Sequence, residues 1–211
     1  MSNQFYMPSV LVEDANGIHA LSTKSLLLKK RVIHLDCPIT SDVVNEVIRA
    51  IFLLSAESHD PLTLLITSPG GEIDAGLALV DAYEACPCIV QTVALGCACS
   101  MGAVLLAAGS PGHRYISAKS KVMIHEPLLG QGVSGSTSHM ETIVNNLKER
   151  RETINKLLCK YTGQDEETMR DATSYDHYFS ANEAVEFGLC DRVVTGEELF
   201  SVIMGGAKNE L

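Results

Sequence analysis

The stretch GCACSMGAVLLAAG, residues 96–109, decides the fold class of this chain. Small residues lead into a continuous apolar run, which is typical of a tight turn between a buried strand and a helix. We expect a strand over residues 89–93 and a helix from Ser100 to Gly109, so that Ser100 stands where the helix begins. Because strands and helices alternate on both sides, the sequence predicts a mainly parallel, layered α/β domain.

The flanking segments continue this alternation. Further strands are expected over residues 32–35, 62–66, 113–116 and 122–124, with a closing strand through residue 194. Further helices are expected over residues 42–56, 75–85, 165–172 and 181–187, and residues 25–31 form either a short helix or the approach to the next strand. A long helix should begin at a capping box, Ser138 to Glu141, and run to about residue 161. We expect one domain, 1–211, with a weakly periodic and mobile N-terminal segment, 1–30, and a C-terminal tail, 195–211.

Composition excludes several classes of protein. The formal net charge of −10 argues against a nucleic-acid-binding protein. No apolar run near residues 103–108 approaches the roughly 20 residues that a membrane-spanning helix needs. Seven cysteines are an odd number, and no basic-then-apolar leader opens the chain. We therefore expect reduced thiols and a cytoplasmic protein, without a membrane partner.

Ser100 is the first candidate for chemistry. The small residues around it leave room for a substrate backbone, and the positive end of the following helix points at it. The N–H of Met101, together with an N–H from Gly70 or Gly71, could hold an anionic tetrahedral intermediate. A serine that begins a helix is more often a simple N-cap, so the turn alone leaves both interpretations open.

A nucleophilic serine needs a base and a group that orients the base. His125 follows an apolar strand and precedes Pro127, which places it at a carboxyl end of the sheet, where sites in open α/β sheets gather. A buried histidine with a purely structural role is the alternative. Asp176 lies in an irregular stretch between helices and is a candidate orienting carboxylate, although spacing does not exclude Asp171.

Five motifs together carry a resemblance. They are SPGGEIDAG at 68–76, the opening stretch, VMIHEPL at 122–128, YTGQDEET at 161–168 and DHYFSANEAVEFGLCD at 176–191. In this order they resemble ClpP, the proteolytic subunit family of the Clp protease. The resemblance implies a ClpP/crotonase-type spiral of ββα units, with a protruding long helix and a glycine-rich loop forming a handle over residues 129–161.

The resemblance also implies function. It implies a serine endopeptidase that assembles into two stacked seven-membered rings and hydrolyses unfolded polypeptide delivered by an AAA+ Clp ATPase. By motif position the catalytic triad is Ser100, His125 and Asp176, and the oxyanion donors are the backbone N–H groups of Gly71 and Met101. No cofactor is implied for this chain, because the partner ATPase uses the ATP.

The chain departs from the family pattern at several positions. Tyr175 stands where an arginine that helps to join the rings is usual, and Glu126 stands where glutamine usually follows the catalytic histidine. Thr63 and Leu65 replace tyrosines that line a docking pocket for the ATPase, and the loop around 129–138 is longer by two residues. These differences suggest a divergent isoform that assembles poorly alone and works with a second ClpP. A non-catalytic ring subunit and a crotonase-type acyl-CoA hydratase or isomerase are the alternatives.

Two cysteines flank the nucleophile position. Cys97 and Cys99 are the other candidate nucleophiles in the opening stretch, but small apolar packing is their expected role. We expect no metal site, because neither they nor Cys86 and Cys88 have the two-residue spacer of zinc-binding pairs. Redox sensitivity near the active site stays as a hypothesis.

Overall fold

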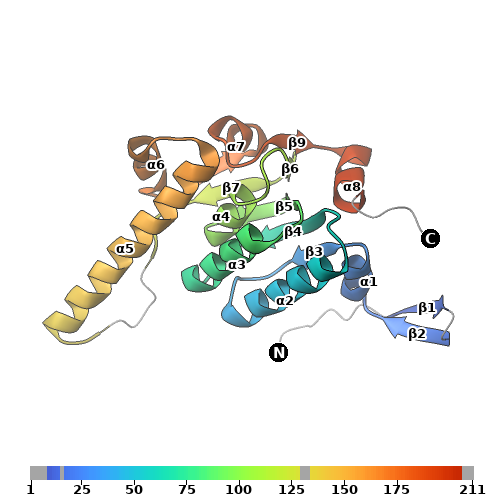
Figure 1. The fold of residues 1–211 in the computed structure, drawn as a ribbon. Coiled ribbons are helices and arrows are strands. Elements are labelled where there is room, and N and C mark those ends of the chain that lie inside the picture. The colour runs from blue at the N-terminus through green and yellow to red at the C-terminus, as the bar shows by residue number, and fades with distance from the viewer. Residues whose placement is uncertain (1–8, 15–16, 129–133, 206–211) are drawn as a thin grey trace, which may run out of the picture.

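The computed structural model describes residues 9–14, 17–128 and 134–205, and it confirms the α/β class with a mostly parallel central sheet (Figure 1). The sheet runs in the order β3-β4-β5-β6-β9, and β7 extends it by pairing with β5 and β8. The strands are β3 (Val32–Leu35), β4 (Leu62–Ser68), β5 (Val90–Cys99), β6 (Arg114–Ser117), β7 (Lys121–Ile124), β8 (His177–Ser180) and β9 (Arg192–Val194). Only the β7–β8 pairing is antiparallel in this sheet.

Helices cover both faces of the sheet. The larger core lies under α2 (Ser41–Glu57), α3 (Ile73–Ala85) and α4 (Met101–Ala107), where Leu64, Ile66 and Ala94 are fully buried. The alternate positions Leu65 and Val93 face the other way, as the two-residue period of a strand requires. There they pack with residues of α1 (Thr23–Lys29) and α8 (Gly196–Met204). Burial on both faces explains why β4 has a near-continuous apolar run over residues 62–66, interrupted by Thr63.

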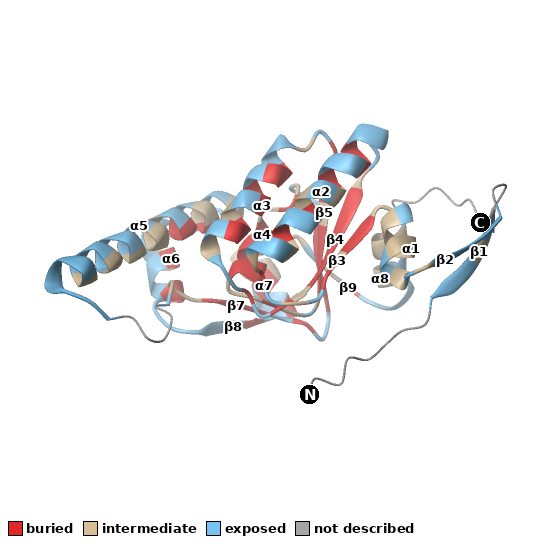
Figure 2. Ribbon diagram, turned by 90° about the horizontal axis from the view of Figure 1, so that it is seen from below, coloured by how far each residue is buried: buried red, intermediate tan, exposed pale blue. Residues whose placement is uncertain are grey.

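Two parts project from this body. The hairpin of β1 (Val10–Asp14) and β2 (Gly17–Leu21) extends at one end (Figure 1). At the other end α5 (Thr137–Thr162) protrudes, and only its C-terminal half is buried against the body (Figure 2). The chain then continues through α6 (Glu166–Thr173) and α7 (Ala181–Phe187). The protruding helix agrees with the expected handle, whose residues 129–133 lie outside the described residues.

Several boundaries differ from the sequence-based predictions. Strand β5 does not end at residue 93 but continues to Cys99, because it leaves β6 and pairs with β7 after Gly96, which has φ +84°. The predicted capping box at Ser138 is wrong: Ser136 is the N-cap of α5, and its hydroxyl accepts a hydrogen bond from the N–H of His139. Strand β8 was not predicted. Two further elements fall in segments that were expected to be irregular, α8 in the tail 195–211 and the hairpin in the segment 1–30.

A buried ion pair joins the last strand to the core. Arg114 is 9% exposed, and its guanidinium donates to the Asp191 carboxylate at 2.6 and 3.1 Å. It also donates to the carbonyls of Tyr161 and Gly188. Burial acts to raise the pKa of Asp191, but the hydrogen bonds and charge of Arg114 outweigh it and hold that pKa below its usual value. The pair therefore ties β6 to the ends of α5 and α7.

Asp191→Ala is expected to lower the free energy of unfolding by about 3 kcal/mol, because it leaves the Arg114 charge buried without its partner. The matched control is Asp36→Ala, which breaks the exposed Lys24–Asp36 pair and should cost no more than about 1 kcal/mol. Because the folded pKa of Asp191 is depressed, its contribution is present above the unfolded pKa and is lost as the pH falls below about 4. Urea unfolding at neutral and acid pH checks this, and equal losses in the two variants would contradict it.

Candidate active site

The turn at Ser100 has an unusual backbone conformation. Ser100 directly follows β5 and has φ +54° and ψ −122°. Among the described residues, only Ser100 and Arg31 combine a side chain with a positive φ. The N–H of Ser100 donates to the carbonyl of Met123 in β7 at 2.7 Å, which holds the turn in place. Strained residues of this kind persist only where the surrounding structure enforces them, and they cluster at functional sites.

The Ser100 hydroxyl does not cap the helix that it precedes. Thr40 and Ser180 accept hydrogen bonds at the starts of α2 and α7, whereas no side-chain hydrogen bond caps α4. Instead, Ser100 Oγ lies 2.9 Å from His125 Nε2. The N-cap interpretation of Ser100 therefore does not describe this turn.

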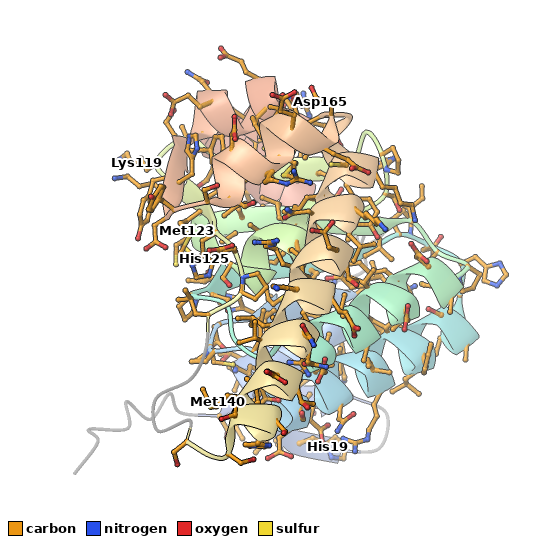
Figure 3. The ribbon with its side chains drawn as sticks, turned by 90° about the vertical axis from the view of Figure 1, so that its left-hand side faces the viewer. His19, Lys119, Met123, His125, Met140 and Asp165 are labelled. Carbon is orange, nitrogen blue, oxygen red and sulfur yellow. The ribbon has the colours of Figure 1, made fainter. Side chains whose placement is uncertain are left out.

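His125 links the turn to a carboxylate. It directly follows β7, its side chain is 14% exposed, and its Nδ1 lies 3.1 Å from Asp176 Oδ1. Figure 3 shows it close to Met123, on the side of the molecule where α5 passes. The antiparallel pairing of Ile124 with His177 sets residues 125 and 176 side by side, so this contact is a consequence of β8. Asp176 makes the contact, and Asp171 lies within α6 instead.

The glycine turn after β4 lies against the Ser100 turn. Gly70 has φ +97°, and a Cβ placed on it would lie 2.6 Å from Ser100 Cβ and 2.7 Å from the Cys99 carbonyl oxygen. A Cβ on Gly71 would lie 2.1 Å from the carbonyl oxygen of Ile39. Neither position can carry a side chain without movement of the backbone. The two turns therefore meet at a distance that only glycine permits.

Two backbone N–H groups of these turns have no acceptor in the secondary structure. The bridge between Ile39 and Gly71 uses the carbonyl of Gly70 and the N–H of Glu72, which leaves the Gly71 N–H out of the pairing. Met101 is the first residue of α4, so its N–H has no acceptor within the helix. The N–H groups of Gly71 and Met101 are therefore candidates to donate hydrogen bonds to an anionic ligand beside Ser100.

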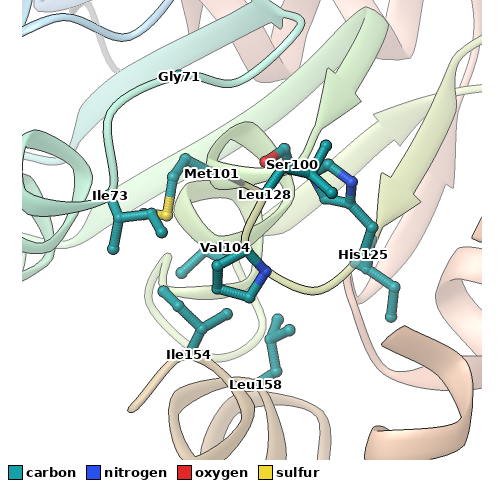
Figure 4. Close-up of a pocket in the computed structure, with 11 residues that line it drawn as sticks. Gly71, Ile73, Ser100, Met101, Val104, His125, Leu128, Ile154 and Leu158 are labelled. Carbon is teal, nitrogen blue, oxygen red and sulfur yellow. Dashed lines mark hydrogen bonds between the residues drawn. The ribbon is translucent and has the colours of Figure 1, made fainter. Parts of the chain in front are cut away.

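An apolar cavity of about 240 Å³ opens beside Ser100 and His125 (Figure 4). Its walls come from elements far apart in the sequence: the glycine turn, α3, α4, the segment after β7, and the buried part of α5. The other lining residues are Gly71, Ile73, Met101, Val104, Ile124, Pro127, Leu128, Ile154 and Leu158. The cavity can hold an uncharged side chain next to the Ser100 hydroxyl. Sequence pattern alone could not show that Ile154 and Leu158 belong to the site, because their contact with it is not local.

The thiol that precedes Ser100 is a poor nucleophile. Burial is the main cause that raises the pKa of Cys99 to about 11, and the neighbouring Cys97 thiol and Asp176 carboxylate add to it. At neutral pH this thiol is protonated, and only a thiolate attacks efficiently. The geometry therefore favours Ser100 over Cys99.

The positions that depart from the family pattern are partly explained. Glu126 pairs with Arg151 of α5 at 3.3 Å, so an arginine balances the additional carboxylate. Tyr175 is 86% exposed. Thr63 is buried and accepts a hydrogen bond from Gln91, while Leu65 packs in the cluster beneath α8.

No helix in the described part of the chain has the length and apolar character needed to cross a bilayer.

Comparison with known families decides the identity of the fold. The family described as Clp protease matches residues 15–197. The chain belongs to the Clp protease family. Membership indicates a ClpP-type peptidase, and this family assembles as oligomers with Clp ATPases. The match spans the Ser100 turn, His125 and Asp176, and it ends near the start of α8.

Proposed function

We propose that this chain is a serine endopeptidase subunit of a self-compartmentalised, ATP-dependent Clp protease. The observation that carries the proposal is the continuous hydrogen-bonded contact from Ser100 Oγ to His125 Nε2 and from His125 Nδ1 to Asp176. This arrangement lies beside an apolar cavity and two backbone N–H donors. A hydroxyl, an imidazole and a carboxylate in this order are the groups that acyl transfer by a serine needs.

The proposed mechanism follows from the geometry. Ser100 Oγ attacks the peptide carbonyl while His125 Nε2 takes its proton, and Asp176 stabilises the imidazolium and keeps the proton on Nδ1. The oxyanion accepts hydrogen bonds from the N–H groups of Gly71 and Met101. When the tetrahedral intermediate collapses, His125 gives its proton to the leaving amine, and the acyl group stays on Ser100. Water, activated by His125, then hydrolyses the acyl-enzyme.

The substrate and partners belong to the same proposal. The cavity walls favour an apolar side chain on the acyl side of the scissile bond. The substrate is unfolded polypeptide, delivered in the cytoplasm by an AAA+ Clp ATPase to stacked seven-membered rings. The ATPase uses the ATP, and this chain supplies the hydrolytic site without a cofactor.

One observation favours a second candidate, a subunit with little activity alone that works with a second ClpP isoform. The side chain of Asp176 is 57% exposed, so its contact with His125 is open to water in the single chain. The crotonase-type alternative has less support. Such an enzyme uses acidic residues for proton transfer, and within the described residues no Asp or Glu lines the cavity beside Ser100.

The first experiment is intact-mass analysis after treatment with a serine-directed fluorophosphonate. We expect one adduct on the wild-type protein and none on Ser100→Ala, because only a serine activated by a base reacts with this probe. A single adduct that persists in Ser100→Ala would overturn the assignment of the nucleophile. If no adduct forms on the isolated protein, the measurement is repeated with the second isoform or the ATPase present. An adduct on Ser100 that forms only then shows that the activity of this subunit depends on that partner.

A further inference from the structure

Three sulfur-containing residues lie beside the Ser100 turn, on the sheet face opposite α4. Ala98 of β5 and Val122 of β7 are fully buried in the core beneath the helices. Because side chains alternate along a strand, Cys97 and Cys99 point to the other face. Both cysteines are partly exposed, and neither forms a disulfide. A ligand from solvent can therefore reach this pair.

The third sulfur comes from the neighbouring strand. β5 and β7 are parallel, and their register sets Cys99 beside Met123 and Cys97 beside Lys121. Partners in register present their side chains on the same face, so the Met123 thioether joins the two thiols. The two thiols also lie close enough for Cys97 to influence the ionisation of Cys99. The sequence alone could not show this third member, because the strand pairing brings it in.

We propose that Cys97, Cys99 and Met123 form a binding site for one Cu(I) ion. Thiolate and thioether sulfur are the soft ligands that Cu(I) prefers. Zinc does not suit this set, because structural zinc sites use four nitrogen, sulfur or carboxylate ligands. Among the described residues no group of three or more histidine, cysteine or carboxylate side chains could hold a metal ion. The combination of two thiols with a thioether points to a soft monovalent ion.

Charge and proton balance are consistent with this ion. Binding replaces the protons of two thiols, so that two protons leave as one Cu(I) enters and the bound unit carries one negative charge. Lys121, beside Cys97 in register, supplies a positive charge on the same face. Because two protons leave on binding, the affinity for Cu(I) should rise with the pH.

The site is one residue from the proposed nucleophile. Cys99 precedes Ser100, and the Met123 carbonyl accepts the hydrogen bond from the Ser100 N–H. The two strands that supply the ligands therefore also hold the Ser100 turn. The inference itself concerns metal binding and does not depend on whether Ser100 is catalytic.

The test is anaerobic competition for Cu(I) against the chromophoric chelator bicinchoninate, with a non-thiol reductant present. We expect the wild-type chain to take one Cu(I) more tightly than Cys97→Ser/Cys99→Ser. The loss should be at least the roughly 10- to 100-fold in affinity that removing a supporting group from a metal site costs. Copper X-ray absorption on the wild-type protein should show sulfur neighbours alone.

A matched control lies in the same chain. Cys86 and Cys88 have the same spacing, but their sulfurs contact Ser55 Oγ at 3.1 Å and the Ser58 carbonyl at 3.4 Å. Cys86→Ser/Cys88→Ser should bind one Cu(I) with the same affinity as the wild-type chain. Met123→Leu conserves volume and keeps the fold, so a fall in its Cu(I) affinity reports a lost ligand. The proposal is overturned if both double variants bind alike, if Met123→Leu binds as the wild type does, or if nitrogen or oxygen neighbours dominate the absorption spectrum.

Discussion

Ser100→Ala is expected to lower kcat/KM for a peptide with leucine before the scissile bond by about 10⁴- to 10⁶-fold. The loss is large because the hydroxyl is the group that bonds covalently to the substrate, and His125 has no other hydroxyl in contact with its Nε2 among the described hydrogen bonds. Hydrolysis is measured on the assembled protein, with its ATPase partner where the isolated protein is inactive.

The same variant should leave stability nearly unchanged. Ser100 makes no capping hydrogen bond, so Ser100→Ala should change the free energy of unfolding by no more than about 0.5 kcal/mol. Ser180→Ala is the matched control, since Ser180 and Glu183 form a complete capping box at α7. That change should cost about 1 kcal/mol and leave kcat nearly intact. If Ser100→Ala instead lost stability and kept its activity, the serine would be a cap.

Gly70→Ala should impair both activity and stability. The added Cβ would lie 2.6 Å from Ser100 Cβ and 2.7 Å from the Cys99 carbonyl oxygen, so the turns must move apart. Misplacing a reacting group by about 1 Å can cost roughly 100-fold in rate, and we expect at least that loss in kcat/KM. Overpacking should also lower the free energy of unfolding by about 1–3 kcal/mol. This loss adds to the backbone strain of placing an alanine at a positive φ.

Gly112→Ala separates backbone strain from steric contact. Gly112 has φ +82°, but nothing lies within 4 Å of the position that a Cβ would take. This control should lose only about 1 kcal/mol of stability and keep normal kinetics. Thermal unfolding and peptide hydrolysis on both variants check the difference. Equal activity in the two variants would show that the Gly70 turn does not position Ser100.

The parts of the fold that the sequence predicted are those set by local pattern. The buried strands over 32–35 and 62–66 are apolar apart from one residue each, His34 and Thr63, and α7 has a serine cap and a glycine stop. The position of His125 directly after a strand could be predicted for the same reason. Ser100 was predicted at the start of a helix, but the strand before it was expected to end at residue 93 and not at Cys99. Such signals lie within a few neighbouring residues and need no knowledge of tertiary contacts.

The parts that could not be predicted depend on pairing between distant segments. β8 buries only Phe179, so its sequence carries no strand period, and it forms because β7 offers an edge. Spacing left Asp171 open beside Asp176, and this pairing is what brings Asp176 to His125. Gly96 resembles a turn, yet β5 passes through it by changing its partner strand. The two serines 136 and 138 both suit a cap, and local pattern does not separate them.

Exposure increases along the chain of contacts from the hydroxyl to the carboxylate. The His125 side chain is 14% exposed and the Asp176 side chain is 57% exposed. A hydrogen bond to a charged group weakens in water and strengthens when protein replaces the water around it. In an oligomeric family, a neighbouring subunit that covers Asp176 would fix the imidazole more firmly than the single chain can. The hydrolytic competence of each subunit would then depend on the surface that its neighbour presents, and assembly itself would be an activating step.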